Sequence, residues 1–365
     1  ALKDSRFATD PYIVRNQPKS VLGMPLIHQG ELVAILYLEN NLTAAAFTSD
    51  RVQTLQVLSS PMAISIKNAQ LYHHVSEMNK AYARFIPREF LRTLGRESIL
   101  DVRLGDQSAQ QMTVLFSDIR DYTTLSESMT PEQNFNFING YLRRISASIQ
   151  ANGGFINQFL GDGIMAIFAD AQGAVQAAIG MQQSLHNYNV QRLSVGRNPI
   201  KMGVGIHTGD LMLGIIGDQD RHNVGVISDV VNSASRIEGL TKTFGVNILA
   251  SESVLSEIRQ RQDFNYRYLG RVQVKGKHGI LPVYEFFDGD EEATARMKQE
   301  SAAMFRQAME EYFNRQFAEA ALYLKKVLTL NPGDRVAEHY LKRAARYLLE
   351  GVGEDWTGVE KMEEK

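Results

Sequence analysis

Apolar and polar positions alternate along the segment Gln111 to Asp288 with two different periods. Stretches with the two-residue period of strands are interleaved with stretches that have the 3.6-residue period of helices. The pattern predicts a strand at 111–117, a helix at 131–151, strands at 154–160 and 163–168, a helix at 171–189, a strand at 201–208, a helix at 228–244, a strand at 246–250 and a β-rich end to 287. The first six elements follow the order βαββαβ, which predicts an α+β fold with a ferredoxin-like sheet.

A hairpin and a long helix are predicted before this segment. Ser20 to Asn40 contains two β-rich runs around a Gln29-Gly30 turn. From Ser49 to Tyr72, apolar residues recur at 52, 55, 58, 62, 66 and 71, a helical stripe that continues toward Phe90 and that Pro61 and Pro87 interrupt. Two interpretations are open: a surface helix of the first domain, or a dimerising connector that passes a signal to the segment that follows.

Helices are also predicted after the mixed segment. Ser301 to Gly351 pairs helical runs around Asn331-Pro332-Gly333-Asp334, with alanines where helices approach closely. This region resembles a tetratricopeptide-type hairpin. One such unit rarely stands alone, so it is expected to pack on the preceding domain or to recruit a partner.

Composition narrows the range of partners and ligands. The 365 residues, 44% of them hydrophobic, suit two to three globular domains. A net charge of −2 argues against nucleic acid as a partner, and no apolar run is long enough to span a membrane. The absence of cysteine excludes disulfides, thiolate zinc sites and a cysteine nucleophile, and favours a cytoplasmic location. The chain begins at Ala1 without an initiator methionine or a signal-peptide pattern, so it is expected to be a fragment.

Two aspartates are the most informative candidates for chemistry. Asp118 follows the apolar strand in VLFSDIRDYTTLSE (114–127), and Asp162 lies at the turn of FLGDGIMAIF. In a βαββαβ sheet the first strand lies beside the hairpin, so the two carboxylates are expected to be neighbours. A pair of divalent cations with oxygen ligands, such as Mg²⁺ or Mn²⁺, would relieve their repulsion. The alternative is ordinary turn and helix-cap chemistry at each position.

Two further groups carry candidate phosphate and sugar contacts. In VISDVVNSASRIEGL (226–240), Ser228 or Asp229 can cap a helix that places Asn232 and Arg236 at i and i+4 on one face. These side chains suit a ribose oxygen and a phosphate that develops charge, although a solvated polar face explains the spacing equally well. Lys275, in VQVKGKHG, can meet a terminal phosphate or can protect an edge strand.

These motifs together resemble class III nucleotidyl cyclases. FSDIRDYTTLSE, GGFINQFLGDGIMAIF, GIHTGDLMLGIIG, VISDVVNSASRIEGLTK and VKGK occur in the order and spacing of that family, over roughly residues 85–287. SVLGMPLIHQGELVAILYLENN resembles the C-terminal half of a GAF domain, and the C-terminal helices with EDWTGV resemble a tail of some bacterial cyclases. The expected domains are a partial GAF domain at 1–70, a helical connector at 71–110, a palm-type cyclase domain at 111–288 and a helical tail at 289–365.

The resemblance implies a role for each matching residue. Asp118 and Asp162, helped by the Ile119 carbonyl, would hold two Mg²⁺ or Mn²⁺ ions per active site, and Thr123 would lie at the phosphate-binding helix start. Asn232 would orient the ribose, Arg236 would stabilise the transition state and Lys275 would bind the terminal phosphate. Asp121 is expected to be a polar residue of the same helix start. The family implies a head-to-tail homodimer in which the aspartates and the Asn, Arg and Lys come from different subunits.

Two positions depart from the adenine-selecting pattern of the family. Adenylate-forming members commonly carry a lysine where this chain has Gln158, and a threonine or aspartate where it has Gly225. ATP is favoured as the substrate by family frequency, giving 3′,5′-cyclic AMP under control of an unidentified small-molecule ligand of the GAF domain. Two alternatives stay open: a cyclase that prefers GTP or a pyrimidine triphosphate, and a catalytically weak signalling module.

Overall fold

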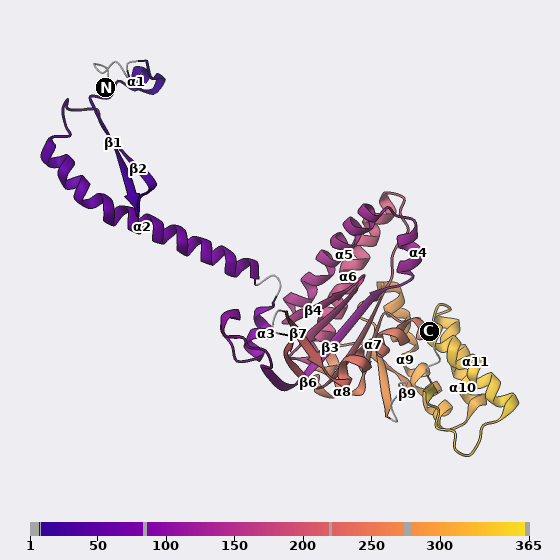
Figure 1. The fold of residues 1–365 in the computed structure, drawn as a ribbon. Coiled ribbons are helices and arrows are strands. Elements are labelled where there is room, and N and C mark those ends of the chain that lie inside the picture. Colours follow the sequence, from indigo (N-terminus) through magenta and orange to yellow (C-terminus); the bar gives the residue numbers. More distant parts are fainter. Residues whose placement is uncertain (1–6, 8, 83–85, 219–220, 274–278, 362–365) are drawn as a thin grey trace. The chain divides into compact units, whose positions relative to one another are not determined.

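The computed structural model describes residues 7, 9–82, 86–218, 221–273 and 279–361, and the chain divides into two compact units at Phe85 and Ile86 (Figure 1). The first unit contains the predicted hairpin. Its strands β1 (Ser20–His28) and β2 (Glu31–Asn40) pair antiparallel around Gln29 and Gly30, both with positive φ. A short helix, α1 (Pro11–Asn16), precedes the hairpin and is capped by the Asp10 carboxylate.

The first unit ends in α2 (Ser49–Tyr82), which runs without a break past Pro61. The expected interruption at this proline is therefore wrong. Proline removes one backbone donor, but the following turn of the helix is held by packing, because Met62, Ala63 and Ile66 contact Met24 and Leu26 of the hairpin. The residues of the predicted apolar stripe do not all pack on the hairpin, since Leu58 and Leu71 are exposed.

The second unit is built on one mixed sheet that has the predicted βαββαβ order at its centre. Its strands run in the order β11, β9, β10, β8, β6, β3, β5, β4, and β7 pairs with β6. The strands are β3 (Gln107–Ile119), β4 (Gly154–Leu160), β5 (Gly163–Phe168), β6 (Met202–Gly217), β7 (His222–Ile227), β8 (Ile248–Ser251), β9 (Tyr266–Gln273), β10 (Ile280–Phe286) and β11 (Glu360–Lys361).

Helices cover both faces of this sheet. They are α3 (Arg88–Thr93), α4 (Tyr122–Glu127), α5 (Pro131–Ala151), α6 (Ala171–Ser194), α7 (Asp229–Phe244), α8 (Glu252–Glu257), α9 (Glu292–Phe313), α10 (Phe317–Leu330) and α11 (Arg335–Glu350). Figure 1 shows α5 and α6 side by side along the sheet, and they share a core with Leu115, Val204 and Ile206. The opposite face packs against α7, whose Ile237 and Phe244 join a core with the C-terminal helices.

The local sequence explains where these helices begin. Thr130 and Gln133 form a reciprocal capping box at the start of α5, with Pro131 in the first turn. Ser228 caps α7 by accepting a hydrogen bond from the Val230 amide, and its hydroxyl also donates to the Asp210 carbonyl at 2.6 Å. The second bond ties the start of α7 to β6.

Helix α7 lies directly on the backbone of β6. A Cβ atom at Gly205 would lie 2.1 Å from the Glu238 amide nitrogen, and one at Gly203 would lie 2.3 Å from Thr241 Oγ1. Glycine is required at 205 because any side chain would press on the backbone of the helix, whereas at 203 the contacts are with side-chain atoms of Thr241 and Glu238. Since Gly203 pairs with Asp118 across β3 and β6, this contact also fixes α7 relative to the end of β3.

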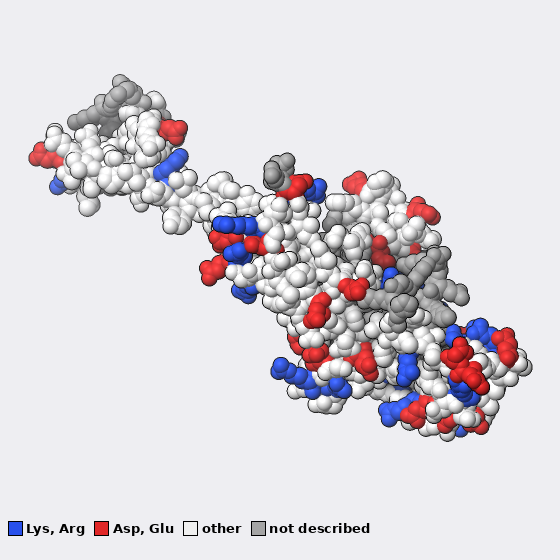
Figure 2. All heavy atoms as spheres, turned by 60° about the horizontal axis from the view of Figure 1, so that its bottom comes forward, with Lys and Arg blue, Asp and Glu red and all other residues white. Residues whose placement is uncertain are grey.

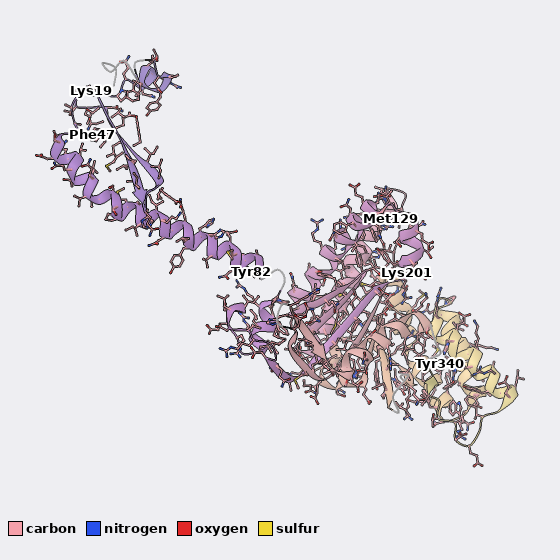
Figure 3. All side chains as sticks on the ribbon, in the orientation of Figure 1. Lys19, Phe47, Tyr82, Met129, Lys201 and Tyr340 are labelled. Atoms are coloured by element: carbon pink, nitrogen blue, oxygen red, sulfur yellow. The ribbon has the colours of Figure 1, made fainter. Side chains whose placement is uncertain are left out.

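The C-terminal helices are joined to the sheet by a buried ionic network. Arg267 on β9 contacts Glu285 and Asp334 at 2.5 Å, and Lys298 on α9 contacts Glu285 and Asp290 at the same distance. Tyr340, which is labelled in Figure 3, lies on α11, and its hydroxyl donates to the Leu269 carbonyl of β9. Figure 2 shows acidic and basic side chains interspersed over the outer surface of these helices. The tail therefore packs on the preceding domain, one of its two expected roles.

Candidate functional site

Asp118 and Asp162 meet at one end of the sheet, as the strand order requires. Ser117 is the last residue of β3 that pairs with β5, opposite Ile164, so Asp118 follows beside the two-residue turn Gly161-Asp162. The Ile119 amide donates a hydrogen bond to Asp162 Oδ2 at 3.2 Å. A Cβ at Gly163 would lie 3.4 Å from Asp118 Oδ1, which places that carboxylate over the β5 end of the hairpin.

The donor set at this sheet end fits a hard divalent cation. Both carboxylates are partly buried, and the Ile119 carbonyl lies between them in sequence. Burial first, and then the negative charges of Asp162 and Asp118, raise the pKa of the Tyr141 phenol beneath them. Among the described residues, no group of three or more His, Cys, Asp or Glu side chains is placed to hold a metal ion. Two carboxylates and a carbonyl leave coordination positions for substrate oxygens or water, which is the usual arrangement for Mg²⁺.

The segment after Asp118 places the next two candidates on the surface. Asp121 occupies the N-cap position of α4 with φ 57° and makes no side-chain cap, and its carboxylate pairs with Lys242 at 3.1 Å. Thr123 lies in the first turn of α4 and is exposed. Asp121 is therefore held by an ion pair to α7, and its expected role as a polar residue of the helix start agrees with this position.

Asn232 and Arg236 lie one turn apart on α7, Asn232 exposed and Arg236 partly buried. A single subunit does not bring Asn232 beside Asp118. The start of α7 is tied to Asp210, whereas Thr241, near its end, lies against Gly203, the strand partner of Asp118. Nine residues of helix separate Asn232 from Thr241, roughly 14 Å along the axis. Within one subunit, the two groups of candidate residues are therefore separate.

Gln158 and Gly225 occupy positions open to solvent or partly so. Gln158 is exposed on β4. Gly225 pairs with Gly214 across β7 and β6, and a Cβ at Gly225 would lie 2.0 Å from Ile216 Cδ1. The side chain of Ile216 therefore occupies the space that a threonine or aspartate at 225 would use. Sequence reasoning missed Ile216, since the register of β6 and β7 had to be known first.

The remaining predicted residue, Lys275, lies outside the described residues, as does all of the VKGK motif. The strands on either side of it, β9 and β10, are antiparallel neighbours.

Comparison with known proteins identifies the family. The family described as "Adenylate and Guanylate cyclase catalytic domain" matches residues 104–287, slightly more than half of the chain. The chain belongs to the class III nucleotidyl cyclases. A GAF domain matches residues 2–66 of this cyclase, in agreement with the resemblance of the hairpin region.

Among relatives of this cyclase, "Adenylate cyclase" of Anabaena cylindrica is 37% identical over 244 residues, which is 65% of this chain and 48% of that protein. "Adenylate cyclase, terminal-differentiation specific" of Dictyostelium discoideum is 33% identical over 276 residues, 74% of this chain and 13% of that protein. The cyclase chain thus spans less than half the length of these relatives. A solved "bacterial light-regulated adenylyl" cyclase shares its fold with a TM-score of 0.53 at 18% identity, over 80% of this chain and 92% of that one.

None of the described helices combines the length and the apolar character that crossing a membrane requires.

Proposed function

We propose that this cyclase converts ATP to 3′,5′-cyclic AMP and pyrophosphate at sites shared between two subunits. The observation that supports this most directly is the pair Asp118 and Asp162, joined through the Ile119 amide at the end of a rigid sheet. The names of the two relatives described above favour adenylate over guanylate as the product. An unidentified small molecule bound to the GAF domain would regulate the reaction.

In this proposal each chain contributes two kinds of group to catalysis. Asp118, Asp162 and the Ile119 carbonyl would hold two Mg²⁺ or Mn²⁺ ions. These ions, when bound, would lower the pKa of the ribose 3′ hydroxyl and neutralise the triphosphate. Asn232 would orient the ribose so that the 3′ oxygen attacks the α-phosphorus in line. Arg236 would stabilise the charge that develops on the phosphoryl oxygens, and Thr123 and Lys275 would contact the phosphates.

The exposed apolar residues of the second unit support a reciprocal dimer. Phe159 and Leu160 are exposed on β4, beside Asp162, whereas Met212 and Ile227, which pair across β6 and β7, are exposed near Ser228, the cap of α7. A two-fold dimer that places the β4 patch of one subunit on the β6–β7 patch of the other would cover both. It would also bring Asp162 toward the partner's Asn232.

Helix α2 independently supports dimerisation, because its exposed residues suit a parallel coiled coil with a second copy of α2. Its exposed residues at 57, 61, 64, 68, 71, 75, 78 and 82 are spaced alternately by four and three, as in the a and d positions of a coiled coil. Six of these eight are large and apolar, and Val57 is 76% exposed. Asn68 stands at an a position, where asparagine specifies parallel two-stranded register. The residues that pack on the hairpin, among them Met62 and Ile66, lie on the opposite face of the helix.

A subunit-mixing assay tests the shared site. Asp118→Ala and Asn232→Ala are each expected to abolish cyclase activity alone, but an equimolar mixture should recover about a quarter of it, because half the dimers regain one of two sites. The matched control mixes Asp118→Ala with Asp162→Ala, which damage the same half-site and should not complement each other. If the first mixture stays as inactive as the control, the interface model is wrong.

The contact of Ile216 with Gly225 favours a second candidate, a cyclase with relaxed base selection. Without a lysine at 158 and with an apolar side chain over 225, this surface offers the base one amide side chain and backbone groups. Product formation from each of the four ribonucleoside triphosphates with Mn²⁺ separates the candidates. Preferential cyclisation of ATP supports the first, and comparable rates with another triphosphate support the second.

A further inference from the structure

A cavity of about 410 Å³ lies between the cyclase domain and the C-terminal helices. Its walls include Arg120, just after β3, Lys201, just before β6, and Asn331 and Arg335, which flank the turn between α10 and α11. Residues of α6, of the segment 245–247 and of the segment 289–298 also contribute to them. A second cavity of about 530 Å³ beside α4 shares Arg120, Lys201 and Arg335 with the first. The volumes are in the range of small-molecule sites. Lys201 is labelled in Figure 3, at the α4 end of the sheet.

Two buried donors at this cavity lack a hydrogen-bond acceptor. Asn331 is 2% exposed, and its side-chain Nδ2 has no partner among the described residues. Arg120 Nε is likewise buried and without an acceptor in the described part of the chain. The other end of that guanidinium donates to the Thr241 carbonyl at 3.1 Å and to the Val246 carbonyl. Leaving such donors unsatisfied is costly, which points to an acceptor absent from the chain itself.

The charges around the cavity are unbalanced. Asp290 and Asp334, which also line it, are already paired with Lys298 and Arg267. Glu291 is exposed at the rim, 3.9 Å from His186. In contrast, neither Lys201 nor Arg335 forms an ion pair within the described residues. Arg120, Lys201 and Arg335 therefore bring three positive charges to a cavity whose two buried carboxylates are already neutralised.

We propose that this cavity binds a small molecule that bears a phosphate monoester. The phosphate oxygens accept from Arg120 Nε and Asn331 Nδ2, and the dianion lies among Arg120, Lys201 and Arg335. A tetrahedral dianion matches two guanidinium groups better than a single carboxylate does. The site is separate from the proposed catalytic residues, but it reaches them through the backbone: the Arg120 amide donates to the Lys201 carbonyl at 2.9 Å, next to Ile119.

Calorimetric titration of the whole chain with inorganic phosphate tests this site, in metal-free buffer whose ionic strength is kept constant with chloride. Arg335 and Lys201 are exposed, so Arg335→Gln and Lys201→Gln should leave the fold intact, which circular dichroism checks. Each variant is expected to weaken phosphate binding by about tenfold or more, the effect of losing one charged hydrogen bond. Arg346→Gln, on the same helix and paired with Glu350 outside the cavity, is the matched control and should bind as the wild type does.

Two results would overturn the proposal. The first is the absence of saturable binding by the wild type, or equal binding by wild type and Arg335→Gln. The second is binding that persists in Arg335→Gln and disappears in Arg236→Ala, which would place the phosphate on the proposed catalytic residues instead.

Discussion

The amide of Ile119 donates to the carboxylate of Asp162 across two strands of the sheet, at 3.2 Å. Residues 43 positions apart are held at a fixed separation by this bond, and Asp118 is the direct neighbour of its donor. The sheet thereby positions both carboxylates before any ligand arrives, so little reorganisation is needed when cations bind.

Removing the charge of Asp118 or Asp162 should impair metal binding without impairing folding. In Asp162→Asn the amide oxygen can still accept from the Ile119 amide, so we expect a normal unfolding midpoint but at least ~100-fold lower cyclase activity. Asp118→Asn should behave in the same way. Asp170→Asn is the matched control, because Asp170 caps α6 and asparagine caps equally well. Activity of Asp162→Asn close to that of Asp170→Asn would contradict the proposed role.

Base selection should respond to Ile216 as well as to Gly225. A threonine at 225 meets Ile216 Cδ1, so Gly225→Thr alone is expected to change the preference for ATP over GTP little. Combining it with Ile216→Ala and Gln158→Lys should raise the ratio of kcat/KM values for ATP and GTP by roughly 10-fold or more. The measurement is initial rates with both triphosphates. An equal gain from Gly225→Thr by itself would show that Ile216 moves away freely.

The contact between α7 and β6 predicts opposite effects for two glycines. Gly205→Ala places a Cβ against the backbone of Glu238 and should destabilise the second unit by about 1 to 3 kcal/mol. Gly239→Ala, on α7 with nothing within 4 Å of its Cβ, should stabilise it by up to about 1 kcal/mol. Urea unfolding of the two variants measures both. Similar midpoints for the two would mean that the helix shifts easily on the strand.

Because of the buried ionic network, the free energy of unfolding should depend on pH. Burial alone would raise the pKa of Asp334, but the charge and hydrogen bonds of Arg267 outweigh it and hold that pKa below its usual value. The stabilisation is therefore present above the unfolded pKa of about 4 and is lost as the pH falls through the folded value. Asp334→Asn keeps the cap of α11 but removes the charge, and should cost about 3 to 5 kcal/mol at pH 7.

Urea unfolding midpoints measured from pH 7 down to pH 3 test whether the stabilisation is lost as the pH falls. The wild type should lose its advantage over Asp334→Asn as the solution is acidified. Glu338→Gln, which breaks an exposed pair with Lys342 on the same helix, should change the midpoint little at any pH. An unchanged difference between wild type and Asp334→Asn across this range would rule out a charged Asp334.

The sequence was sufficient where local pattern and tertiary packing agree. Helix 131–151 and strands 154–160 and 163–168 have the predicted bounds, because strong periodicity coincides with a capping box and a two-residue turn. β6 extends nine residues beyond its predicted end at 208, because this part of the strand pairs with the start of β3 and with β7.

Other features depend on contacts that no local pattern encodes. Arg267, Glu285 and Asp334 look like ordinary surface charges in the sequence, yet they are buried together where the tail meets the sheet. Ile216 becomes a candidate for base selection through its position over Gly225, nine residues away along the hairpin. Pro61 is tolerated in α2 because packing on the hairpin holds the helix around it.

The glycine contact between β6 and α7 has a consequence for the proposed dimer as a whole. In the proposed dimer, Gly203 would connect Asp118 in one active site to α7 of the same subunit, whose Arg236 would belong to the other site. At Gly205, two residues further along β6, the backbone of the helix lies directly on the strand, so neither element can move without the other. Occupancy of one site is therefore expected to alter the affinity of the second, and the dimer should show cooperative substrate binding even though its two sites are chemically identical.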